Sequence, residues 1–141
     1  MRRLLPGILL LALATSLAGC NDNTTTPTPT TTTAPASPAT TETFTGTLHL
    51  NGAETYNFLA NTGGTVVITL TALPSGTQPI GLSLGTWTGS ACQIVIDNSN
   101  ASQAAVVTGT VTAAASLCAR VYDAHGTTST PADFTVTAAH P

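Results

Sequence analysis

The sequence contains very little charge. Only 6% of its 141 residues are charged, whereas about a quarter are charged in an ordinary soluble domain. Two of the three cations, Arg2 and Arg3, lie at the very start, and the third is Arg120. A surface with so few cations cannot neutralise phosphates, so we exclude nucleic acids and anionic lipid headgroups as electrostatic partners.

Motifs for catalysis and metal binding are also missing. The sequence has no nucleophile elbow, phosphate-binding loop or paired carboxylates. His49, His125 and His140 are scattered, without a second ligand at metal-binding spacing, so we expect no metal, no cofactor and no enzymatic activity. Two alternatives stay open. Asp123 and His125 share one turn, and we favour a role in forming that turn over a catalytic pair. Residues 97–100 offer oxygen ligands suited to calcium, but they lack the spacing of a calcium-binding loop.

The first 19 residues have the pattern of a signal peptide. A positively charged start precedes the apolar run 4–14, which is roughly half the length that a membrane-spanning helix needs. Leu17-Ala18-Gly19-Cys20 then follows in the order of a lipobox. The segment resembles the signal peptides of bacterial lipoproteins, which implies acylation of the Cys20 thiol and cleavage before it. A plain secretory signal with an incidental cysteine is the alternative.

Residues 20–41 are predicted to form a lipidated, disordered tether. The segment after Cys20 consists mainly of Thr and Pro and has no large apolar residue to bury. Its prolines favour an extended chain of about 3.1 Å per residue, with a reach on the order of 60 Å. Two or more acyl chains give stable anchoring. We therefore expect the protein to be attached to a membrane of the cell envelope through the N-terminal lipid, facing the periplasm or the cell exterior. O-glycosylation of the tether threonines stays open.

From residue 42 the pattern changes to the alternation typical of β-strands. Turn signals such as Asn51-Gly52 and residues 61–64 separate the apolar segments. About eight short strands are predicted, near residues 44–50, 56–60, 66–72, 80–87, 92–96, 104–111, 117–122 and 134–138. No helical period competes outside the signal. This spacing predicts an all-β sandwich over residues 42–141.

The strand patterns resemble a known family. Residues 54–72, with Tyr56, Phe58 and Gly63-Gly64, resemble part of the bacterial pre-peptidase C-terminal domain, and residues 117–123 and 133–137 resemble its last two strands. The resemblance implies a jelly-roll-like β-sandwich of antiparallel strands that acts as a non-catalytic appendage. The family often has an acidic residue entering its middle strand. The corresponding residues 79–85 contain no acid, so the resemblance implies no cation site here.

Two cysteines remain once Cys20 is assigned to lipidation. Cys92 and Cys118 would face an oxidising compartment, where a disulfide is the default pairing in a small exported domain. Strand parity conflicts with this pairing. Cys92 has the same parity as Ile94 and Ile96, whereas Cys118 has the parity opposite to that of its apolar neighbours Leu117, Ala119 and Val121, so the two cysteines would not both point into the core. A bulge or a loop position for Cys92 would remove the conflict. Two free thiols are the alternative.

Together these features predict a non-enzymatic, membrane-tethered lipoprotein whose β-sandwich is an interaction or stability module, with an envelope protein or a glycan as its further partner. A carbohydrate-binding module on the cell surface is the alternative function. It rests on Trp87, a candidate ligand contact between glycines and threonines, and on Tyr56 and Tyr122. A core or barrel-end position for Trp87 is the competing interpretation.

Overall fold

The computed structural model describes residues 38 and 40–141, so Cys20, the predicted signal peptide and nearly all of the predicted tether lie outside the described residues. Within the described part, the chain forms eight β-strands and no helix. No helix there is long and apolar enough to cross a membrane. The strands are β1 (Thr40–Leu48), β2 (Ala53–Ala60), β3 (Gly64–Ala72), β4 (Ile80–Trp87), β5 (Cys92–Ala101), β6 (Val106–Val111), β7 (Ala115–Tyr122) and β8 (Ala132–His140).

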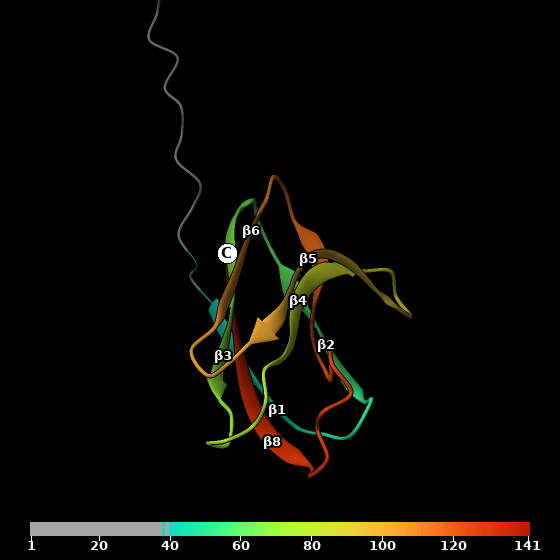
Figure 1. The fold of residues 1–141 in the computed structure, drawn as a ribbon. Coiled ribbons are helices and arrows are strands. Elements are labelled where there is room, and N and C mark those ends of the chain that lie inside the picture. Colours follow the sequence, from blue (N-terminus) through green and yellow to red (C-terminus); the bar gives the residue numbers. More distant parts are fainter. Residues whose placement is uncertain (1–37, 39) are drawn as a thin grey trace, which may run out of the picture. The chain divides into compact units, whose positions relative to one another are not determined.

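The strands form two four-stranded antiparallel sheets that face each other (Figure 1). The strand order is β1-β8-β3-β6 in the first sheet and β2-β7-β4-β5 in the second. Successive strands lie in opposite sheets except for the β4–β5 hairpin, whose two strands pair with each other. This order is that of a jelly roll, so the predicted all-β jelly-roll-like sandwich is confirmed.

The core fills the space between the two sheets, as the alternating pattern requires. In β3, Val66, Ile68 and Leu70 are completely buried, whereas Val67 and Thr69 between them are partly exposed. The same alternation places the remaining large apolar side chains inside, among them Leu48, Phe58, Ile80, Leu82, Leu84, Leu117, Val121, Phe134 and Val136. Burial of these side chains stabilises the sandwich by roughly 25 cal/mol per Å² of apolar surface.

The first strand differs from its predicted bounds at both ends. It begins at Thr40, two residues before the predicted start of the domain, because Thr40 pairs with His140 of β8. It ends at Leu48, and Leu50, which continues the apolar alternation, is 55% exposed. The reason is the Asn51-Gly52 turn, in which Asn51 has a φ of 55° and the Gly52 N–H donates to the His49 carbonyl at 2.8 Å.

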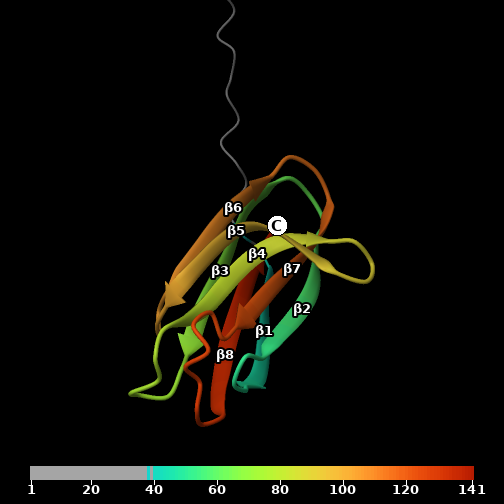
Figure 2. The ribbon, with the colours of Figure 1, turned by 45° about the vertical axis from the view of Figure 1, so that its right-hand side comes forward.

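The chain enters the sandwich at one end, and three of its loops gather at the other. At one end β1 begins opposite the end of β8, where Thr40 pairs with His140. At the other end Leu48 pairs with Ala132, and the β1–β2, β3–β4 and β7–β8 connections gather there, at the bottom of both ribbon views (Figure 2). We call this second end the loop end.

Candidate functional site

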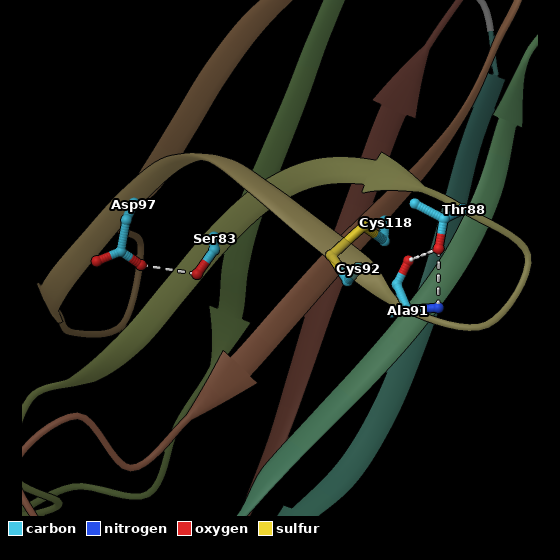
Figure 3. The surroundings of a disulfide bond; sticks show 6 residues. All are labelled: Ser83, Thr88, Ala91, Cys92, Asp97 and Cys118. Atoms are coloured by element: carbon cyan, nitrogen blue, oxygen red, sulfur yellow. Dashed lines mark hydrogen bonds between the residues drawn. A yellow bond between two sulfur atoms is a disulfide. The ribbon is translucent and has the colours of Figure 1, made fainter.

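The predicted disulfide is present. Cys92, the first residue of β5, is bonded to Cys118 of β7 with the two Cα atoms 5.8 Å apart (Figure 3). Thr88 and Ala91 close the β4–β5 hairpin directly before Cys92: the Thr88 hydroxyl donates to the Ala91 carbonyl at 3.1 Å and accepts the Ala91 N–H at 3.2 Å (Figure 3). The bond therefore joins the start of one strand to the middle of another in the same sheet.

A β-bulge removes the conflict in strand parity. Leu84 pairs with Ile96, but the next residue, Gly85, pairs with Ile94, so Val95 is an extra residue in β5. As a result Ile96 packs against the core while Cys92 points to the outer face of the sheet. Cys118, 0% exposed, lies on the same outer face, because its neighbours in β7 fill the core.

On the outer face of β4, two glycines are in close contact with groups from neighbouring strands. A Cβ atom on Gly85 would overlap the Gln93 carbonyl group and lie 3.1 Å from Cys92 Sγ, and a Cβ atom on Gly81 would overlap the Tyr122 ring. Only glycine allows these approaches. The alternating glycines that the sequence places in β4 are therefore positions where the disulfide hairpin and an aromatic ring cover the sheet.

Between these two glycines lies a hydrogen-bonded network. The Ser83 hydroxyl donates to Asp97 Oδ1 at 2.7 Å, and the Tyr122 hydroxyl donates to the two carboxylate oxygens at 3.0 and 2.9 Å. Arg120 lies 5.1 Å from the centre of the Tyr122 ring. Burial, and then the hydrogen bond with Asp97, raise the pKa of Tyr122. Asp97, one of the oxygen ligands considered for calcium, thus binds hydroxyl groups of the protein.

Asp123 organises the loop end. Its carboxylate accepts N–H groups of Asn51 at 3.0 Å, Thr127 at 3.1 Å and Thr128 at 3.2 Å. Burial by itself raises the pKa of Asp123, but the hydrogen bonds from these three residues outweigh it and lower the pKa to about 2. The carboxylate therefore stays charged and connects the β1–β2 turn to the β7–β8 loop.

The three histidines have separate environments. His125 Nε2 lies 2.9 Å from the Ser99 carbonyl and 3.2 Å from Asn100 Oδ1, so His125 and Asp123 belong to different networks and not to one catalytic pair. His140 is 2% exposed, with Nε2 3.1 Å from Glu42 Oε1, and His49 is exposed. Within residues 38 and 40–141, no three His, Cys, Asp or Glu side chains lie close enough to hold a metal ion.

The aromatic residues considered for sugar stacking are distributed over the molecule. Tyr56 is packed between the sheets, with its ring stacked on Phe44 at 4.9 Å and edge-on to Phe134 at 6.3 Å. Tyr122 covers Gly81. Trp87 ends β4, opposite Cys92, and is partly exposed. The three residues therefore form no common platform for a sugar. Of the three, Trp87 remains the candidate ligand contact.

The loop end contains a groove that the sequence did not predict. It has a volume of about 370 Å³ and lies between the β3–β4 loop (residues 74–78) and the β7–β8 loop (residues 127–132). We call it the loop groove. Its two walls are about fifty residues apart in the sequence and contain no aromatic or charged residue, so no local motif marks them. A smaller, mostly apolar opening of about 120 Å³ lies between β4, β5 and β6.

Comparisons with known proteins give little further information. No protein-family model matches the chain, and no curated protein matches it. Among solved structures, the chain is similar to the crystal structure of the Yersinia pseudotuberculosis-derived mitogen, with 17% sequence identity, a TM-score of 0.49, and coverage of 74% of this chain and 87% of the mitogen chain.

Proposed function

We propose that this protein is a non-enzymatic lipoprotein of the cell envelope, held on a membrane through Cys20 and facing the periplasm or the cell exterior, with its jelly roll as an interaction module. The observation that carries the proposal is the bond between Cys92 and Cys118. Disulfides persist in oxidising compartments, which supports export. The bond also uses both cysteines of the folded domain, so Cys20 in the lipobox is the remaining thiol.

The chain path supports a role as a displayed module. The tether that we propose enters the jelly roll at Thr40, at the end where β1 pairs with His140. The loop end lies at the other end of β1, and a strand of nine residues spans on the order of 25–30 Å. A partner that contacts the loops is thus bound at the end away from the attachment point. The predicted resemblance to the pre-peptidase C-terminal domain, a non-catalytic appendage, agrees with this role and stays a prediction from strand patterns.

Detergent phase partition tests the anchor. The wild-type protein, produced with its signal sequence in a bacterium, is expected in the detergent phase, and Cys20→Ala in the aqueous phase. The double variant Cys92→Ala/Cys118→Ala is the matched control, because it removes the other two cysteines and keeps the lipobox. If Cys20→Ala stays with the detergent, the anchor is not at this residue.

Carbohydrate binding remains the second candidate function. The aromatic arrangement gives it less support than the sequence suggested, because the ring of Tyr56 packs against Phe44 and Phe134, and Tyr122 covers the sheet. The specific observation in its favour is the loop groove, which is lined by neutral polar side chains from two loops.

A further inference from the structure

We propose that the loop groove binds a neutral glycan. This inference rests on the proposed function in one respect: it takes the jelly roll as an interaction module and names the chemical class of its ligand. It does not depend on the lipid anchor.

The chemistry of the lining points to a ligand rich in hydroxyl groups. Hydroxyl side chains come from both walls, and the amide of Gln78 adds a further donor and acceptor; the hydroxyl residues that are exposed or partly exposed are Ser75, Thr77, Thr127, Ser129 and Thr130. Among the described residues that line the groove, none is charged. A charged ligand would therefore lose hydration without gaining an opposite charge. A neutral sugar both donates and accepts hydrogen bonds, so it matches this lining.

The shape and the apolar part of the lining fit the same ligand class. The volume of about 370 Å³ falls within the range of about 300–1,000 Å³ found for small-molecule sites. Pro74 and Pro131, both exposed, lie on opposite walls. Their rings present C–H surfaces against which the C–H face of a sugar ring can pack. The groove thus combines hydroxyl partners with small apolar surfaces, although it has no aromatic platform.

The walls of the groove are ordered by hydrogen bonds within the protein. Asp123 holds the N–H groups of Thr127 and Thr128, and the Ser129 N–H donates to the Thr127 carbonyl at 2.8 Å. On the other wall the Thr77 N–H donates to the Pro74 carbonyl at 3.2 Å. A site that is ordered before binding loses less conformational entropy when the ligand arrives. Ser129 and Thr130 are exposed, so these ordered loops present hydroxyl groups that a ligand can reach.

The position of the groove favours access to the surroundings. The loop groove lies at the loop end, where its walls are formed by residues after β3 and by the end of the β7–β8 loop together with Ala132, the first residue of β8. The chain enters the sandwich at Thr40, at the opposite end. Figures 1 and 2 show both loops at the same end of the sandwich, away from the C-terminus. A lipid-tethered domain of this design presents the groove away from its own attachment point.

An NMR titration tests the proposal. The purified full-length protein in detergent micelles is titrated at millimolar concentrations with three neutral oligosaccharides: the tetramers of β1,4-linked glucose, α1,4-linked glucose and β1,4-linked N-acetylglucosamine. At least one is expected to cause saturable shifts of the backbone amides of residues 75–78, 127–130 and 132 and their neighbours, and of no others. An anionic oligogalacturonate of the same length is expected to cause no such shift. Absence of saturable shifts with all three neutral sugars, or shifts centred on Trp87, would overturn the proposal.

Substitutions locate the site. Thr127→Ala/Thr130→Ala is expected to weaken the affinity by about tenfold, the loss expected for two hydrogen bonds. Thr108→Ala, on exposed β6 outside the groove, is the matched control and is expected to bind like the wild type. If the double variant fails to fold, Ser75→Ala on the opposite wall replaces it, with a smaller expected loss. Unchanged affinity in a folded groove variant contradicts the assignment.

The test separates the glycan site from the anchor. Cys20→Ala lacks the lipid under the proposed function but keeps the groove, so it is expected to bind the oligosaccharide as tightly as the wild type. A wild-type protein that binds the oligosaccharide but stays in the aqueous phase refutes the lipid attachment alone. Intact anchoring without sugar binding refutes the glycan site alone.

Discussion

Asp123→Asn is expected to remove a pH-dependent part of the stability of this protein. The carboxylate of Asp123, 9% exposed, accepts three backbone N–H groups of the loop end. An amide in its place keeps one accepting oxygen and presents an NH₂ group to at least one of these donors. The variant therefore loses the charge and leaves a backbone N–H without its partner.

The magnitude follows from the pKa. Asp123 has a pKa of about 2 in the folded protein, against an ordinary value of 3.8. The difference corresponds to about 2 kcal/mol of unfolding free energy. Because the folded pKa is lowered, this contribution is present above pH 3.8 and is lost as the pH falls toward 2. The wild type is expected to lose it over that window, and Asp123→Asn is expected to lack it already at neutral pH.

Urea unfolding at several pH values between 7 and 2, followed by far-UV circular dichroism, measures the effect. Asp133→Asn is the matched control, because it removes another carboxylate near the loop end, one that is exposed and accepts the Thr47 hydroxyl instead of backbone N–H groups. The stability curves of the wild type and of Asp123→Asn should converge as the pH falls. Curves that run parallel down to pH 2 would refute the argument.

Three further predictions concern the framework of the jelly roll. Reduction of the Cys92–Cys118 bond is expected to lower the unfolding free energy by about 2–5 kcal/mol, and an unchanged urea midpoint would contradict this. Gly81→Leu is expected to destabilise the fold by about 1–3 kcal/mol or more, because the new side chain would overlap the Tyr122 ring; a wild-type melting temperature would show that the ring moves freely. A chain beginning at Thr40 is expected to melt like the longer chain, whereas one beginning at Phe44 melts lower, because buried His140 loses Glu42. Equal melting temperatures for these two shortened chains would refute the second half of this expectation.

The sandwich could be predicted from the sequence because its signals are local. Alternating apolar residues such as Val66, Ile68 and Leu70 mark a strand with one buried face, and Asn51-Gly52 marks the turn after β1. The disulfide was predicted by counting the cysteines of a chain that we expected to be exported. The jelly-roll order was implied by the family resemblance, since alternation alone does not say which strands pair.

Features that depend on tertiary contacts could not be predicted. The bulge at Val95 became visible only through the pairing of β4 with β5, although the parity conflict of Cys92 required a bulge or a loop. The start of β1 at Thr40 depends on pairing with β8. A threonine-rich sequence does not indicate such pairing. The loop groove combines two distant loops of neutral residues, and a site without aromatic, charged or metal-binding residues leaves no motif in the sequence.

The most direct test of the central claim is the mass of the N-terminal peptide. The protein is isolated from bacterial membranes, digested, and its first peptide is identified by mass spectrometry. We predict that this peptide begins at Cys20 and has the added mass of a diacylglyceryl group, with or without a further acyl chain. A peptide that begins elsewhere, or that has an unmodified Cys20, would contradict the claim that this jelly roll is a lipid-anchored module of the cell envelope.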